Sequence, residues 1–295
     1  YAQRDIPVEK LKLKYAQTPS KFLPLMGMQV HYRDEGNPND PSPLILIHGT
    51  SSSLNTWDSV VKIIVSNPKN KKRIIRFDLP AFGLTGPNPE NDYGGAYYIN
   101  FVDSFLNLLQ IKKCTIAGNS LGGGIAWQYA VAHPEKVKSV TALAPAGLWH
   151  EGPTQLLPPS LFARVLAKCA QYFLRLAYQL PPLKAMGYRK ITHLWRELSF
   201  ESCKDSVLAM AKSTGYMPMW KALRGKKFDS HIPPHVPVKI VFGDYDLTLP
   251  HPRAQEKDAA PAHSEWITVD NCAHVIMWNY PQLTIDFIAD HLKRR

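Results

Sequence analysis

The sequence predicts an α/β protein with a mostly parallel sheet that helices cover on both faces. Two observations predict this class. Short apolar runs alternate along the chain with segments of helical length. Most of these runs are mainly apolar and do not alternate strictly with polar residues, as is typical of parallel strands buried on both faces. Parallel neighbours need crossover connections, which the helical segments between the runs supply.

The individual elements follow from local patterns in chain order. Residues 28–36, "MQVHYRDEG", alternate apolar and polar side chains and predict a half-buried strand. Short, mainly apolar runs predict buried strands at 44–49, 73–80, 113–120, 137–145 and 237–244. A final strand is predicted at 265–270, before a closing helix near 280–293. The remaining helices are predicted near 54–66, 97–110 and 121–133.

One connection is much longer than the others. Between the strands at 137–145 and 237–244 there is helical periodicity, Pro-Pro punctuation and no strand pattern. We therefore predict a helical lid or cap over residues 148–234. Residues 1–20 are expected to form an N-terminal extension. The α/β core is expected to consist of residues 21–147 and 235–295.

Composition limits the possible partners. Hydrophobic residues make up 45% of the 295-residue chain and charged residues 20%, an ordinary balance for a globular protein. The formal net charge is +11, and residues 148–232 carry 13 Lys and Arg against 5 Asp and Glu. No nucleic-acid motif accompanies this charge, so a basic surface is expected and a nucleic-acid partner is not. The four cysteines lack metal-ligand spacing and are expected to be free thiols.

A glycine-flanked serine is the strongest candidate for chemistry. In "CTIAGNSLGGGIAW" (114–127), Gly118, Ser120 and Gly122 satisfy the pattern G-x-S-x-G. The pattern is weak alone, but here it lies between a predicted strand and a predicted helix. A sharp turn there strains the backbone at the serine and leaves no room for side chains two residues away. The turn would present Ser120 at the carboxyl ends of the strands as a nucleophile.

A serine nucleophile needs a base and an acid that orients the base. After such a turn they are expected in the order acid, then histidine. The segment "GDYDLTLP" offers Asp244 and Asp246 after the strand at 237–244. His274 follows the last strand. Order and placement therefore predict a Ser–His–Asp triad.

With these motifs, the chain resembles the α/β-hydrolase family, of the lidded esterase and lipase kind, from about residue 20 to the C-terminus. The resemblance implies an eight-stranded sheet. The family's pattern of Gly, Asp three residues later and then Pro matches Gly243, Asp246 and Pro250, which favours Asp246 over Asp244. The small residue before the family's histidine matches Ala273, although glycine is more usual there.

The resemblance also implies an oxyanion hole. The segment "HGT" (48–50) resembles the family's oxyanion loop. The backbone N–H groups of Thr50 and Leu121 are then the expected donors, and His48 has a structural role. The segment "DLPAFGLT" (78–85) resembles another family turn with an architectural role, with Ala81 where glycine is more usual.

The predicted activity is hydrolysis of carboxylic esters with short to medium acyl chains, without metal or cofactor. Relatives with an aspartate nucleophile are disfavoured by Ser120. Carbon–carbon bond hydrolysis and acyl transfer or perhydrolysis remain alternatives, the first disfavoured because Val275 follows His274. A ligand-binding protein with little turnover is the alternative of another class. The nine other histidines, His31 among them, are expected at the surface or in caps.

The expected location depends on "LFARVLAKCAQYFLRLAYQL" (161–180). Its polar side chains form one helical stripe: Arg164, Lys168, Gln171, Arg175 and Gln179. An ordinary lid helix accounts for this pattern, and a basic helix resting on an anionic membrane is the rival. The stretch "VEKLKLKYA" resembles the segment after a removed anchor in exported bacterial relatives. A membrane-associated or exported enzyme is therefore expected, with a cytoplasmic one as the alternative and the oligomeric state open.

Overall fold

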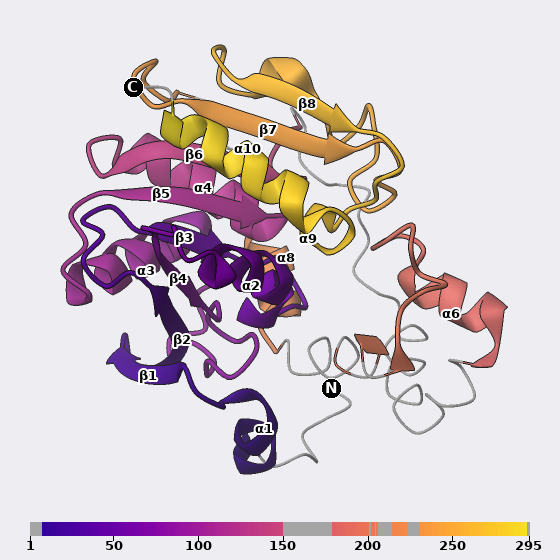
Figure 1. Ribbon diagram of the computed structural model, residues 1–295, viewed down its shortest axis with the longest axis horizontal. Helices are drawn as coiled ribbons and strands as arrows, with labels where there is room; N and C mark the ends of the chain where they lie inside the picture. Colours follow the sequence, from indigo (N-terminus) through magenta and orange to yellow (C-terminus); the bar gives the residue numbers. More distant parts are fainter. Residues whose placement is uncertain are drawn as a thin grey trace.

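The computed structural model describes most of the chain, namely residues 8–149, 179–200, 202–203, 205, 214–223 and 231–293. Its centre is an eight-stranded sheet in the order β1-β2-β4-β3-β5-β6-β7-β8 (Figure 1). The strands are β1 Ser20–Leu25, β2 Met28–Gly36, β3 Leu44–Ile47, β4 Arg73–Phe77, β5 Cys114–Asn119, β6 Val137–Leu143, β7 Val238–Gly243 and β8 Glu265–Val269. The helices are α1 Val8–Tyr15, α2 Asp58–Ser66, α3 Gly95–Leu108, α4 Leu121–Ala132, α6 Pro181–Tyr188, α8 Tyr216–Leu223, α9 Ile276–Asn279 and α10 Pro281–Lys293. Two short 3₁₀ helices are η1 Leu54–Trp57 and η2 Lys257–Ala259.

The predicted α/β class is confirmed. Strand β2 pairs antiparallel with β1 and β4, and all pairs from β4 onwards through β8 are parallel. All seven predicted strands are present. The sequence does not predict the eighth, β1, as a separate run, because "SKFLPL" contains Pro24 and lacks strict alternation. Proline is tolerated there because β1 is an edge strand.

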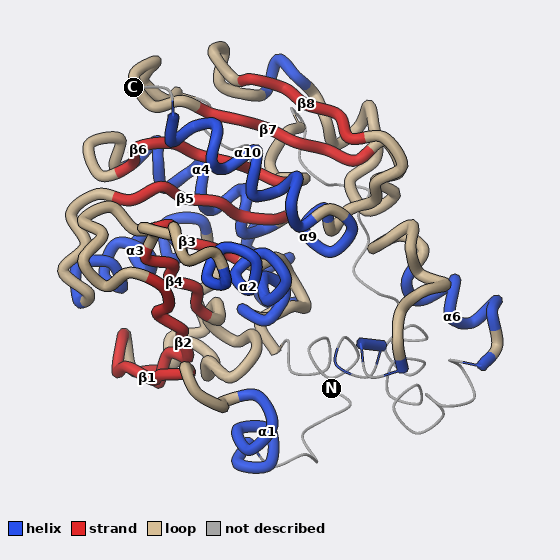
Figure 2. Tube along the Cα trace, viewed as in Figure 1, coloured by secondary structure: helices blue, strands red, loops and turns tan. Residues whose placement is uncertain are grey.

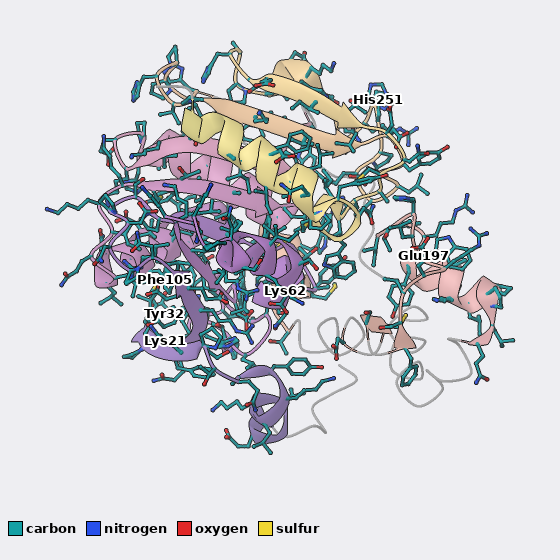
Figure 3. All side chains as sticks on the ribbon, viewed as in Figure 1. Lys21, Tyr32, Lys62, Phe105, Glu197 and His251 are labelled. Atoms are coloured by element: carbon teal, nitrogen blue, oxygen red, sulfur yellow. The ribbon has the colours of Figure 1, made fainter. Side chains whose placement is uncertain are left out.

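Helices cover both faces of the sheet, as Figure 2 shows. In β3, Leu44 and Leu46 pack with α2, α9 and α10, whereas Ile45 and Ile47 pack with α3 and α4. All four side chains are buried, so the run has no polar side. On the second face the rings of Tyr32 in β2 and Phe105 in α3 meet edge to face, with centroids 5.6 Å apart (Figure 3).

The long connection between β6 and β7 contains α6 and α8, and its described residues form no strand. Helix α8 packs on the core through buried Met219 and partly buried Trp220 and Leu223. Residues 161–178 of the basic stripe lie outside the described part of the chain, and so does Cys169. In the part that the structure describes, no helix is long and apolar enough to cross a membrane.

The three described cysteines are buried free thiols, namely Cys114, Cys203 and Cys272. Burial raises the pKa of Cys114 and of Cys272 to about 12. Thiols of this kind are protonated at neutral pH and chemically quiet.

A buried carboxylate at the end of β4 connects three segments. Asp78 accepts the backbone N–H groups of Leu54, at 2.7 Å, and Leu84, at 2.8 Å, and its Oδ2 lies 2.7 Å from Nδ1 of His31. Burial alone would raise the pKa of Asp78, but the His31 hydrogen bond and nearby histidines hold it below its usual value. His31 is fully buried, so its expected place at the surface or in a cap is wrong. Its ring neighbours a carboxylate that sequence spacing did not reveal.

We expect Asp78→Asn to lower the free energy of unfolding by about 3–5 kcal/mol near neutral pH, because it breaks a buried charged network. The folded-state pKa of Asp78 is depressed, so its contribution is present above the unfolded pKa and lost as pH falls below it. The difference between wild type and variant should therefore shrink below about pH 4. Urea unfolding across pH measures this, with the exposed Asp286→Asn as the control. A constant difference down to the acid transition would contradict the assignment.

Candidate active site

Ser120 lies on a strained turn between β5 and α4. Its φ of 55° and ψ of −119° lie in a region that non-glycine residues rarely adopt. The backbone N–H of Ser120 donates to the carbonyl of Leu143 at 2.9 Å. Its own carbonyl accepts from Gly124 at 3.1 Å and from Ala146 at 3.0 Å. These bonds to β6 and to the first turn of α4 hold the strained residue in place.

The two glycines of the motif allow the backbone to approach itself. A Cβ at Gly118 would lie 2.1 Å from the carbonyl oxygen of Gly122. A Cβ at Gly122 would lie 2.4 Å from that of Ile47 and 2.5 Å from that of His48. Helix α4 therefore begins against bare backbone at the end of β3, which is where the structural role of Gly118 and Gly122 was expected.

The structure brings the predicted histidine and one of the two predicted carboxylates together. Nδ1 of His274 lies 2.8 Å from Oδ2 of Asp246, and both residues are buried. The other oxygen of Asp246 accepts the backbone N–H groups of Thr248 and Leu249 at 2.9 and 2.8 Å. A carboxylate can only accept here, so Nδ1 donates and Nε2 is left as the basic nitrogen.

Asp244 is placed differently. Its side chain accepts the backbone N–H of Cys272 at 2.9 Å, and the residue is exposed. The N–H of Tyr245 donates to the carbonyl of Cys272 at 2.9 Å. Asp244 therefore ties the loop after β7 to the loop after β8, while Asp246 faces the histidine.

The segment expected to form an oxyanion loop lies against Ser120. A Cβ at Gly49 would come within 3.0 Å of the Ser120 Cβ. His48 accepts the N–H of Leu79 at Nε2, 3.0 Å away, so its Nδ1 carries the proton and donates to the carbonyl of Gly49 at 2.7 Å. Burial lowers the pKa of His48, which keeps this ring neutral. Leu121 is the first residue of α4, where backbone N–H groups have no partner within the helix.

Comparison with known proteins identifies the family. The family model described as the alpha/beta hydrolase fold matches residues 42–281. The chain belongs to the α/β-hydrolase family. It is 23% identical over 284 residues to monoacylglycerol lipase abhd6-A of Xenopus laevis, covering 92% of this chain and 81% of that one. It is also 28% identical to the 2-hydroxymuconate semialdehyde hydrolase of Pseudomonas sp. CF600, over 41% of this chain and 42% of that one.

A solved structure has the same fold. The meta-cleavage product hydrolase CumD of Pseudomonas fluorescens IP01 matches with a TM-score of 0.68 and 18% sequence identity. The match covers 92% of this chain and 97% of that one. Together with the family match, this establishes the α/β-hydrolase fold. The names of the relatives indicate that they act on different substrates.

Sequence reasoning missed one residue of this hydrolase that touches the site. The side-chain nitrogen of Asn119 donates to the carbonyl oxygens of Leu143 and His274, each at 3.1 Å. The residue before Ser120 thus fixes the backbone of the distant histidine. Its position inside G-x-S-x-G was visible in the sequence, but its partners lie 24 and 155 residues away.

The hydrolase contains a hydrogen-bonded set of Ser, His and Asp away from Ser120. Nε2 of His31 lies 2.9 Å from Oγ of Ser20, and Nδ1 lies 2.7 Å from Asp78. Arg33 also donates to Oγ of Ser20, at 3.0 Å. Ser20 lies in the edge strand β1, and its φ is not among the left-handed values. This set ties β1 to β2 and serves as an internal control for any serine-directed reagent.

Among the described residues, no group of three or more His, Cys, Asp and Glu side chains is placed to hold a metal ion. The polar groups at the carboxyl ends of β5, β7 and β8 include the Asp246–His274 pair and the N–H groups that begin α4.

We expect Gly122→Ala to destabilise the protein by about 3 kcal/mol or more, because its Cβ would overlap two backbone oxygens that cannot move aside. Gly86→Ala is the matched control, since a Cβ there meets nothing within 4 Å. The control should change the free energy of unfolding by less than about 1 kcal/mol. Equal stability of the two variants in urea titration would show that α4 does not approach β3 as closely as described.

Proposed function

We propose that this α/β hydrolase cleaves carboxylic esters with short to medium acyl chains through an acyl-enzyme formed on Ser120. The observation that carries the proposal is the buried Asp246–His274 pair at 2.8 Å, at the same sheet edge as the strained Ser120 turn. All the candidate residues follow the carboxyl ends of strands, namely β3, β5, β7 and β8, so they lie at this edge.

In the proposed reaction, Oγ of Ser120 attacks the ester carbonyl carbon while Nε2 of His274 takes its proton. Asp246 holds the imidazole ring and stabilises its positive charge. Backbone N–H groups of Thr50 and Leu121 receive the developing oxyanion. The alcohol leaves with the proton from His274, and a water molecule, deprotonated by the same nitrogen, then releases the carboxylic acid and regenerates Ser120.

The relatives favour more than one substrate class. The lipase relative supports an ester substrate, because its match extends over most of both chains. The hydrolase of 2-hydroxymuconate semialdehyde supports the alternative of carbon–carbon bond cleavage, although it matches a smaller part of this chain. Acyl transfer would use the same acyl-enzyme with another acceptor. A binding protein with little turnover is the remaining alternative, and sustained alcohol release over many turnovers, after any burst, would exclude it.

Ser120→Ala should abolish the burst of p-nitrophenol from p-nitrophenyl butyrate, and Asp246→Asn should lower kcat by about 10³–10⁴-fold because the histidine loses its orienting partner. Asp244→Asn is the matched control and should cost less than about tenfold, since it removes one hydrogen bond between loops. If Asp244→Asn were the damaging change and Asp246→Asn the mild one, the acid assignment would be wrong.

A fluorophosphonate probe, which labels reactive serines, distinguishes Ser120 from Ser20 directly. Peptide mapping should place the label on Ser120, leave labelling intact in Ser20→Ala, and find none in Ser120→Ala. Label on Ser20 in the wild-type protein would contradict the assignment of Ser120 as the nucleophile.

We expect kcat/KM to rise from acetate to butyrate or hexanoate esters and then to fall. Tyr98 of α3 and Leu223 of α8 lie close to Leu121 and Gly124, so apolar side chains gather beside the proposed oxyanion donor. Each methylene that an acyl chain buries against apolar side chains would gain about 0.8 kcal/mol. A series of p-nitrophenyl esters measures the profile, and activity confined to acetate would contradict an apolar acyl site.

A further inference from the structure

Helix α6 shows apolar side chains to solvent. Leu180, at its N-cap, Leu183 and Met186 are 43%, 41% and 61% exposed. The packed side of the helix contributes Tyr188 and Ala185 to a small hydrophobic cluster with Trp195 and Cys203. Two polar groups anchor it there: Nζ of Lys184 donates to two backbone carbonyls, at 2.8 and 2.9 Å, and the hydroxyl of Tyr188 donates to the carbonyl of Cys203 at 2.7 Å. The helix is therefore apolar towards solvent as well as on its packed side, whereas an ordinary surface helix exposes a polar side.

The charges beside this helix are mostly positive. Residues 179–200 contain four Lys and Arg and a single acidic residue, Glu197, which lies on the segment after α6 (Figure 3). Arg189, Lys190 and Arg196 are exposed. An exposed apolar surface bordered by basic side chains complements an anionic lipid surface, where apolar groups enter the headgroup boundary and cations meet phosphates.

The segment after α6 is bonded to both loops of the proposed active site. The carbonyl of Lys190 accepts the hydroxyl of Thr248 at 3.2 Å, and the carbonyl of Ile191 accepts the N–H of Val275 at 3.0 Å. Thr248 and Val275 follow Asp246 and His274 by two residues and one residue. On the first of these loops, Tyr245 and Leu247 are also exposed, at 57% and 46%.

We propose that Leu180, Leu183, Met186, Tyr245 and Leu247, here called the α6 face, dock on an anionic lipid bilayer. Docking there would place the mouth of the Ser120 site at the bilayer surface, so that the substrates are esters held in lipid. The docking stands on exposure and charge, and the substrate class rests on the proposed function. It is independent of the basic stripe at 161–180, most of which lies outside the described residues.

Binding is measured first, with Ser120→Ala protein so that no ester is consumed. Vesicles of phosphatidylcholine with about 30% phosphatidylglycerol should bind the protein, and phosphatidylcholine alone should bind it weakly. Raising the salt concentration should release it. Leu183→Glu with Met186→Glu should lower the partition coefficient at least about tenfold, because two charges enter the contact.

The matched control is Leu108→Glu, at an exposed leucine (56%) that ends α3 shortly before the amino end of β5, whereas the segment after α6 bonds to loops at the carboxyl ends of β7 and β8. It should bind vesicles like the parent. Equal recovery in the supernatant with both kinds of vesicle overturns the proposal. Unchanged binding of the double variant, or an equal loss in Leu108→Glu, overturns it as well. Saturable binding of the α6 face to a protein, without binding to vesicles, would also overturn the proposal.

Hydrolysis then tests the substrate class with Ser120 in place. The double variant should cleave p-nitrophenyl butyrate within about twofold of the parent, which also shows that it is folded. Its hydrolysis of monoacylglycerol held in anionic vesicles should fall about tenfold, in step with binding. If the parent binds vesicles but hydrolyses neither ester, the proposed function fails and the docking stands. If hydrolysis of the vesicle ester does not fall with binding, the substrate class is wrong.

Discussion

The close contact between the start of α4 and the end of β3 is the constraint on which the rest of the site depends. Glycine at 122 lets the helix rest on two backbone oxygens, and glycine at 118 lets β5 turn back on itself. The cost is a left-handed φ at Ser120, held by hydrogen bonds to β6 and α4. If a side chain at position 122 pushed α4 away from β3, both Ser120 and the backbone amides beside it would be displaced.

Two buried Asp–His pairs fix the loops at this edge of the sheet. Asp246 and His274 lie at the candidate site, with the carboxylate fixed by two backbone amides. Asp78 is fixed in the same way but faces His31 and the edge strand. Through Leu54 it positions the far end of the loop that contacts Ser120, while His48 holds the near end. The similarity of the two pairs shows that an Asp–His hydrogen bond alone does not identify an active site. The left-handed backbone at Ser120, which Ser20 lacks, distinguishes them.

The long connection between β6 and β7 contacts the rest of the protein in two ways. Helix α8 packs into the main core, whereas α6 packs in a small cluster of its own and the segment after it bonds to the loops that follow Asp246 and His274. Thr192 extends these links to Asn279, whose side chain it meets at 2.5 Å. These hydrogen bonds connect the segment after α6 with the loops that follow Asp246 and His274.

The sequence by itself determined the α/β class, seven of the eight strands and the turn at Ser120. These features depend on local properties, namely apolar runs, helical segments and glycines two residues from a serine. Only the tertiary structure decided which carboxylate faces His274, where the side chain of Asn119 goes and that His31 is buried beside Asp78. It also decided that α6 shows apolar side chains to solvent. Each of these is a contact between residues far apart in the chain, and a linear pattern sets no distance between such residues until the strands have paired.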